Sequence, residues 1–87
     1  MKIAIVGTGY VGLITGTCFA NAGNDVTCLD IDSKKVETLR KGEAPFFEPG
    51  LSEMMTKSIN AGRLHFTDDA ATAFEDTSII FICVGTP

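Results

Sequence analysis

The sequence lacks tryptophan and has little positive charge. Its 87 residues hold seven Lys and Arg against eleven Asp and Glu, which gives a formal net charge of −4 at pH 7. The basic residues gather only in short pairs such as Lys34–Lys35. A nucleic-acid-binding domain carries a clustered basic face, so we expect no nucleic-acid partner. An anionic ligand would have to be held by backbone amides rather than by bulk charge.

Cysteine is also scarce, with Cys18, Cys28 and Cys83 and no Cys-x-x-Cys pair. An odd number of cysteines, without the spacing typical of metal ligands, argues against a disulfide framework and against a zinc site. Each thiol lies in an apolar segment, where free cysteine behaves as a small hydrophobic residue. We therefore expect no metal site and a reducing, cytoplasmic compartment.

Long apolar runs are absent too. The N-terminal stretch superficially resembles a signal peptide, but its continuous apolar run is only Ile3–Val6 and glycines follow it. No segment approaches the roughly 18 apolar residues that span a membrane. This pattern again favours a cytoplasmic protein with no membrane partner.

Strand and helix patterns alternate along the chain. Apolar runs predict strands at 3–6, 25–29, 64–67 and 79–84. The six apolar residues 79–84 give the strongest signal for a buried strand. Helical spacing predicts a first helix with Val11, Ile14, Cys18, Phe19 and Ala22 on one face, a second beginning at Asp32 or Ser33, a third from Leu51 to Gly62, and a short one capped by Thr67 or Asp68.

This alternation indicates an α/β fold, because parallel strands need crossover helices. The right-handed crossover rule then gives a Rossmann-type doubly wound parallel sheet with the order 3-2-1-4. A six-stranded dinucleotide fold needs two more strands. We therefore expect residues 1–87 to be the incomplete N-terminal portion of one NAD-binding Rossmann domain.

The segment Gly7-Thr8-Gly9-Tyr10-Val11-Gly12 has the pattern G-x-G-x-x-G between a strand and a helix. Gly7 permits a tight turn, Gly9 lets the backbone approach a pyrophosphate, and Gly12 allows close helix–strand packing. The amides at the start of the helix then bind the phosphates. The spacing alone is weak evidence, but the strand–turn–helix context strengthens it.

Asp30 indicates which dinucleotide binds. It lies eighteen positions beyond Gly12, at the end of the second strand, where a carboxylate can accept both adenosine ribose hydroxyls. Its charge opposes the 2′-phosphate of NADP, and no arginine is nearby, so the cofactor is predicted to be NAD. Lys35 either reaches the ribose or adenine edge or is an ordinary solvated helix lysine. A P-loop is excluded because Leu13 stands where that motif needs lysine.

The turn after the fourth strand is expected to form the second edge of the crevice. Gly85 and Thr86 should face the glycine turn there, and Thr86 is either a cofactor contact or a simple turn residue. Tyr10 is expected to cover the cradle rather than to take part in chemistry. His65 lies away from the crevice with no acid partner spaced nearby, which favours a structural role.

Several segments together resemble the UDP-glucose/GDP-mannose dehydrogenase family. They are Gly7-Thr8-Gly9-Tyr10-Val11-Gly12-Leu13, Leu29-Asp30-Ile31-Asp32, Glu48-Pro49-Gly50-Leu51, Gly62-Arg63-Leu64 and Cys83-Val84-Gly85-Thr86-Pro87. The resemblance implies the NAD-binding part of an oxidoreductase that converts the C6 alcohol of a nucleotide sugar to a carboxylate with two NAD+. The UDP-glucose 6-dehydrogenase branch, which makes UDP-glucuronate for polysaccharide biosynthesis, is favoured. A GDP-mannose or other nucleotide-sugar dehydrogenase is the alternative.

The resemblance also implies site residues. Val11, Asp30, Lys35 and Thr86 match NAD contacts of the family, whereas its catalytic cysteine lies beyond residue 87. We therefore assign no catalytic residue and expect this part of the chain to be inactive alone. In full length the family implies a homo-oligomer. Glu48 either orders its loop or faces the sugar. A non-catalytic NAD-binding or redox-sensing module remains the other functional class.

Overall fold

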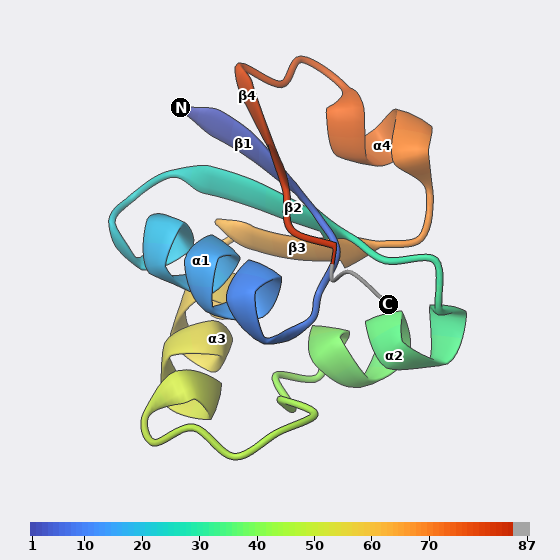
Figure 1. Ribbon diagram of the computed structural model, residues 1–87. Helices are drawn as coiled ribbons and strands as arrows, with labels where there is room; N and C mark the ends of the chain where they lie inside the picture. Colours follow the sequence, from blue (N-terminus) through green and yellow to red (C-terminus); the bar gives the residue numbers. More distant parts are fainter. Residues whose placement is uncertain (85–87) are drawn as a thin grey trace.

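Four parallel strands form the centre of the structure, a computed structural model that describes residues 1–84 (Figure 1). The elements, in chain order, are β1 (Lys2–Val6), α1 (Tyr10–Asn21), β2 (Asp25–Leu29), α2 (Ser33–Arg40), α3 (Leu51–Asn60), β3 (Leu64–Thr67), α4 (Ala70–Phe74) and β4 (Ile79–Ile82). The strand order is β3-β2-β1-β4, all parallel, which confirms the predicted Rossmann-type topology.

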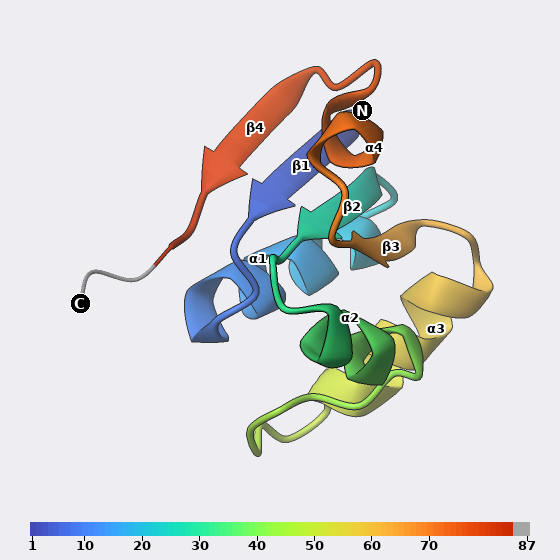
Figure 2. The same ribbon diagram turned by 90° about the vertical axis from the view of Figure 1, so that its right-hand side faces the viewer.

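The helices cover the two faces of the sheet unequally. α1, α2 and α3 lie on one face and α4 on the other (Figure 2). The parallel register places Ile5 of β1 beside Cys28 of β2, and Cys28 beside Phe66 of β3. These side chains meet Leu13 of α1 and Leu39 of α2 in the core. Burial of this apolar surface stabilises the three-helix side of the sheet.

The buried face of α1 consists mostly of small residues, which corrects the predicted one, although Ile14 and Phe19 of the predicted face are partly buried against the core. Its buried residues are Gly12, Leu13, Gly16, Thr17 and Ala20. Val11 and Cys18, from the apolar stripe, are exposed instead. The reason is the close approach of α1 to the sheet, because a Cβ on Gly16 would lie 2.8 Å from the Cys28 sulfur. A residue without a side chain at Gly16 therefore allows α1 to approach the sheet closely.

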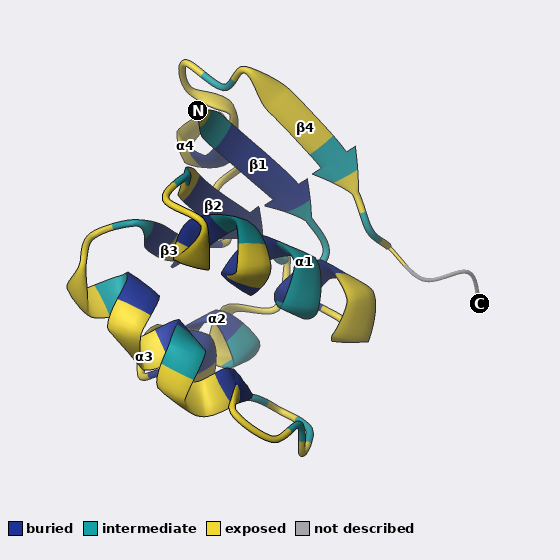
Figure 3. Cartoon of the chain, turned by 90° about the vertical axis from the view of Figure 1, so that its left-hand side faces the viewer, coloured by how far each residue is buried: buried dark blue, intermediate teal, exposed yellow. Residues whose placement is uncertain are grey.

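β4 is shorter and more exposed than predicted. It ends at Ile82 rather than at Val84, and its exposed surface is visible in Figure 3. Within residues 1–84, β4 lies at the edge of the sheet and pairs only with β1. On the face opposite α1, α4 contacts β2 and β3, so Ile80 and Ile82 stay 47% and 66% exposed. On the α1 face Phe81 stacks on Phe19 with ring centroids 5.2 Å apart.

Carboxylate side chains cap two of the helices. The Asp32 side chain accepts hydrogen bonds from the amides of Lys34 and Lys35 at the start of α2, which fits one of the two predicted caps. At α4 the cap is Asp69, one residue beyond the predicted Asp68 and two beyond the predicted Thr67, because the Thr67 hydroxyl instead accepts a hydrogen bond from the Asp69 amide. Among residues 1–84 no helix is long and apolar enough to cross a membrane.

Candidate functional site

The glycine turn connects β1 to α1 at the carboxyl edge of the sheet. Gly7 has a φ of +100°, a left-handed conformation that favours glycine. Its amide donates to the Leu29 carbonyl at 2.8 Å, and a Cβ on Gly7 would lie 2.9 Å from the Cys83 carbonyl oxygen. A Cβ on Gly12 would lie 2.0 Å from the Gly7 carbonyl oxygen. Both positions therefore need glycine for the fold itself.

Gly9 differs from its two neighbours in the motif. Its φ of −70° suits any residue, and a Cβ built on it would meet no atom within 4 Å. Gly9 is also the N-cap of α1, and no side chain among residues 1–84 caps this helix. The amides of the first turn, which begins at Tyr10, therefore lack the partner that a capping residue supplies and face open space. Such a helix N-terminus favours an anion, and its surroundings leave room for one.

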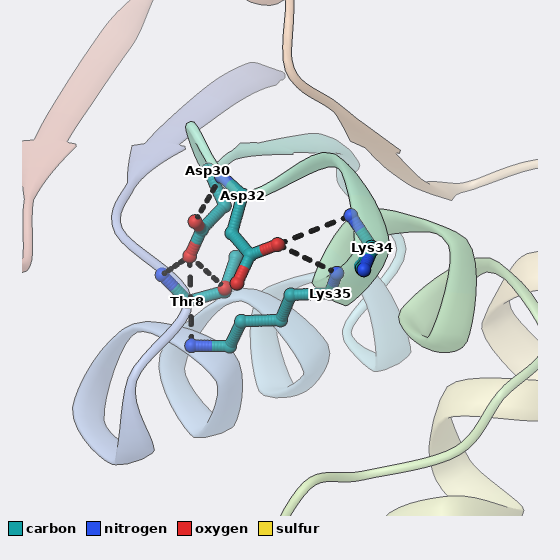
Figure 4. A network of polar contacts seen from close by, with 5 residues as sticks. All are labelled: Thr8, Asp30, Asp32, Lys34 and Lys35. Carbon is teal, nitrogen blue, oxygen red and sulfur yellow. Dashed lines mark hydrogen bonds and ion pairs between the residues drawn. The ribbon is translucent and has the colours of Figure 1, made fainter.

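Asp30 follows β2 and lies at the centre of a polar network beside the glycine turn (Figure 4). Its Oδ2 accepts a hydrogen bond from the Thr8 hydroxyl and lies 3.4 Å from the Thr8 amide nitrogen. Its Oδ1 accepts the Asp32 amide at 2.9 Å. Lys35 reaches across from α2, with its Nζ 3.5 Å from Oδ2. The carboxylate is thus oriented by the turn on one side and by α2 on the other.

These contacts keep Asp30 ionised. Partial burial alone raises the pKa of Asp30, because a charged group loses hydration. The hydrogen bonds from the Thr8 hydroxyl and the Asp32 amide, together with the Lys35 charge, outweigh burial and bring the pKa below its usual value. A carboxylate that is ionised at neutral pH accepts hydrogen bonds from hydroxyl groups and repels a phosphate.

A small, mostly apolar hollow adjoins Asp30. It is lined by Val6, Gly7, Leu29, Asp30, Ile31 and Val84. Its position, at the ends of β1 and β2, suits the flat apolar base of an adenosine whose ribose meets the carboxylate. A larger hollow lies by α4 and β3, where Lys2, Asp25, His65 and Glu75 contribute charges of both signs. No residue of the glycine turn lines that larger hollow.

Tyr10 connects the turn to the loop before α3. The Tyr10 side chain is 57% exposed, and its hydroxyl donates a hydrogen bond to Glu48. Its ring packs against Phe46, with centroids 5.0 Å apart. The neighbouring Val11 is 63% exposed at the same edge of the sheet. This geometry fits a Tyr10 that covers the turn.

The structure brings most of the predicted site residues to one edge of the sheet. They are Gly7, Gly9, Tyr10, Val11, Gly12, Asp30 and Lys35. Gly85 and Thr86 lie outside the described residues, although the preceding Cys83 and Val84 pass beside Gly7, where the turn after β4 was expected. Within residues 1–84 no cluster of His, Cys, Asp and Glu could hold a metal ion.

Sequence reasoning does not single out Thr8. It occupies a variable position of the glycine motif, and its only signal is a hydroxyl in a loop that directly follows a buried strand. The structure shows that this side chain is 1% exposed and bonded to Asp30. Its partner is 22 positions away, which local pattern does not reveal.

Comparisons with known proteins agree with this geometry. The sequence profile described as "UDP-glucose/GDP-mannose dehydrogenase family, NAD binding domain" matches residues 1–87. The chain is 51% identical, over its whole length, to a UDP-glucose 6-dehydrogenase of Rhizobium meliloti (strain 1021), and 51% identical over 99% of its length to the UDP-glucose 6-dehydrogenase TuaD of Bacillus subtilis (strain 168). It spans only 20% and 19% of those relatives.

A solved structure shows the same fold. The GDP-mannose dehydrogenase of Pseudomonas aeruginosa, crystallised as a ternary complex, matches all of this chain with a TM-score of 0.95 and 39% sequence identity. The matched part is 20% of that chain. The four-stranded sheet therefore corresponds to about a fifth of a larger dehydrogenase.

Proposed function

Because the chain belongs to the UDP-glucose/GDP-mannose dehydrogenase family, as its NAD-binding domain, we propose that it binds NAD+ for a dehydrogenase that oxidises UDP-glucose to UDP-glucuronate. NAD+, when bound, accepts hydride from the substrate, and conversion of an alcohol to a carboxylate uses two NAD+ in turn. The residues that react with the sugar lie outside residues 1–87.

The observation that carries the proposal is that an ionised carboxylate, Asp30, and the uncapped N-terminus of α1 lie at the same edge of the sheet. The amides of that first turn would hold the pyrophosphate, and the open space at Gly9 lets it approach. Asp30, ionised and fixed at the end of β2, would accept the adenosine ribose hydroxyls. Lys35 contributes one positive charge beside it.

The same carboxylate supports NAD over NADP. A 2′-phosphate on the ribose would meet the negative charge of Asp30, and like charges in contact are strongly unfavourable. Lys35 does not compensate, because Asp30 already pairs with it at 3.5 Å.

UDP-glucose is proposed as the substrate on the 51% identity to two UDP-glucose 6-dehydrogenases. The fold match to a GDP-mannose dehydrogenase favours GDP-mannose as the second candidate. We propose that residues outside this sequence select between the two sugars. We further propose a cytoplasmic homo-oligomer, and the three free thiols fit the reducing compartment.

Isothermal titration calorimetry of the purified chain with NAD+ and with NADP+ tests the cofactor. We expect NAD+ to bind more tightly, and Asp30→Ala to remove most of that preference. Asp69→Ala is the matched control, because it removes one negative charge from the N-cap of α4. This variant should keep the preference for NAD+. Equal affinity for both dinucleotides in the wild-type chain contradicts the proposal.

A second assay tests where the chemistry lies. Incubation of the chain with NAD+ and UDP-glucose should form no NADH, since the reacting residues are assigned to the rest of the protein. Turnover by these 87 residues would refute that assignment. The same assay, run with UDP-glucose and GDP-mannose on a protein that extends beyond residue 87, identifies the sugar.

A further inference from the structure

Thr8 is buried within the glycine turn and reaches the carboxylate that follows β2. Its side chain is 1% exposed, and its hydroxyl donates to Oδ2 of Asp30 (Figure 4). The Thr8 amide nitrogen lies 3.4 Å from the same oxygen. Because the side chain is covered by protein, Thr8 can affect a bound ligand only through Asp30.

The donors around Asp30 leave room for a diol. A carboxylate has two oxygens with about four lone-pair positions in total. The Asp32 amide uses one on Oδ1, and the Thr8 hydroxyl uses one on Oδ2, where the Thr8 amide forms a second, longer hydrogen bond at 3.4 Å. Lys35 approaches Oδ2 only to 3.5 Å, from a side chain that is 29% exposed. Oδ1 therefore keeps a position for one hydroxyl, and Oδ2 can accept another if the long contacts from the Thr8 amide and the Lys35 ammonium give way.

We propose that Thr8 is a positioning residue for cofactor selection, whose hydroxyl holds the Asp30 carboxylate in the orientation that accepts both adenosine ribose hydroxyls. This inference rests on the proposed NAD-binding function and adds a residue to it. Without the Thr8 hydroxyl, the Asp30 side chain would be held by the Asp32 amide on Oδ1 and, on Oδ2, only by the long contacts from the Thr8 amide and the Lys35 ammonium. A carboxylate free to rotate loses affinity for a diol, because its orientation must be restricted on binding.

The lowered pKa of Asp30 supports the same role. Although partial burial raises this pKa, the Thr8 hydrogen bond is the largest of the contacts that bring it down. The other charged groups around the carboxylate are Lys35 on α2 and Asp32 at its N-cap. Loss of the Thr8 hydroxyl should therefore move the Asp30 pKa upward while Lys35 and Asp32 stay in place.

The first experiment measures NAD+ affinity by calorimetry in a double-mutant cycle. Thr8→Val keeps the shape of the side chain and removes the hydroxyl, and we expect about a tenfold loss of affinity, the size of about one good hydrogen bond to a charged group. Thr8→Ser restores the donor and should stay within about threefold of wild type. In an Asp30→Ala background, Thr8→Val should have no further effect.

Thr17→Val is the matched control. Thr17 is also buried, in the same helix that follows the turn, and its hydroxyl has no hydrogen-bond partner among residues 1–84. The same substitution there should leave NAD+ affinity unchanged. If Thr8→Val does not fold, as judged by circular dichroism, Thr8→Ala replaces it in the cycle.

The second experiment needs no cofactor. Carbon-detected NMR of the Asp30 carboxyl during a pH titration should show a higher pKa in Thr8→Val than in wild type or Thr8→Ser. Unchanged titration, or an equal loss of NAD+ affinity with and without Asp30, overturns the inference. If the wild-type chain binds no NAD+, the proposed function fails, whereas the titration still decides whether Thr8 holds Asp30.

Discussion

The Tyr10 hydroxyl donates a 2.5 Å hydrogen bond to a carboxylate oxygen of Glu48, 38 positions further along the chain. Phe46, from the same loop, packs on the Tyr10 ring. Together these contacts hold the loop before α3 against the first turn of α1. They support the interpretation of Glu48 as a residue that orders its loop, since its carboxylate already has a partner within the chain.

Glu48→Gln should lower the pKa of Tyr10. In the folded chain the hydrogen bond to Glu48 and its negative charge raise this pKa, because a phenolate would lose the bond and face a like charge. The chain has one tyrosine and no tryptophan, so the ultraviolet absorbance of tyrosinate during a pH titration reports Tyr10 alone. Glu43→Gln removes the same charge from the same loop as a control. Equal shifts in the two variants would show that the specific contact is unimportant.

The sign of the linked stability effect follows from the raised pKa. The folded chain retains the Tyr10 proton to higher pH than the unfolded chain, whose tyrosine titrates near pH 10. The contribution of this contact is therefore present below about pH 10 and is lost as the pH rises through the folded-state value.

Asp30 should contribute to unfolding at low pH, whereas the Tyr10 contact is lost at high pH. Its pKa is lowered in the folded state, so its stabilisation is complete above the unfolded value of about 3.9 and is lost as the pH falls through the folded value. Urea unfolding of wild type and Asp30→Asn, from about pH 6 to about pH 3, measures this difference. We expect a smaller loss of stability on acidification in Asp30→Asn.

Asp69 provides the control for that experiment. Hydrogen bonds from Thr72 lower the pKa of Asp69 at the start of α4, away from the glycine turn. Asp69→Asn should therefore remove a separate part of the acid sensitivity, and the two effects should add. An acid transition in Asp30→Asn identical to that of wild type would show that Asp30 titrates normally.

Asp30→Ser should shift the cofactor preference toward NADP. The substitution removes the charge that opposes a 2′-phosphate. It also releases Lys35, whose Nζ lies 3.5 Å from Oδ2 of Asp30 in the wild-type chain. An unpaired lysine beside the ribose can bind phosphate, so we expect the NADP+ to NAD+ affinity ratio to rise by about tenfold or more, equivalent to ~1.4 kcal/mol. Calorimetry measures both affinities. Adding Lys35→Ala to Asp30→Ser should remove the part of the gain that Lys35 supplies, and an undiminished gain would show that Lys35 is not responsible.

Local pattern predicts the parts of this fold that depend on local signals. The glycine turn and the Asp32 cap follow from spacing within one element, and the structure confirms them. The strand order follows from the handedness of crossovers, which the strand–helix alternation already implies. Asp30 is found because the motif specifies its distance from Gly12.

Features that depend on contacts between elements are not predictable in this way. The apolar run at the fourth strand predicts burial, yet exposure of β4 depends on where α4 packs. His65 was expected to have no acid partner, which is wrong: its Nε2 lies 3.3 Å from Asp25. The pair forms because the parallel register sets His65 beside Thr27, two residues from Asp25 on the same face of β2. Thr8 is missed for the same reason, as its partner Asp30 follows a different strand.

Gly9→Ala and Gly12→Ala should separate cofactor binding from folding. At Gly9, φ is −70° and a Cβ would meet nothing within 4 Å, so alanine fits the turn and should change stability by less than about 1 kcal/mol. At Gly12 a Cβ would lie 2.0 Å from the Gly7 carbonyl oxygen, and relieving that overlap should cost about 3 kcal/mol or more.

NAD+ affinity should respond differently. The methyl group of Gly9→Ala points into the open space at the start of α1, where the pyrophosphate must approach the backbone, so affinity should fall by at least about tenfold in a fully folded chain. Thermal unfolding and calorimetry on the same samples measure both properties. A Gly9→Ala chain that binds NAD+ as wild type does would show that the phosphates lie elsewhere. A Gly12→Ala chain as stable as wild type would show that α1 can move away from the turn. These outcomes would show that at Gly9 the approach of the ligand, rather than the packing of the chain, sets the limit on side-chain size.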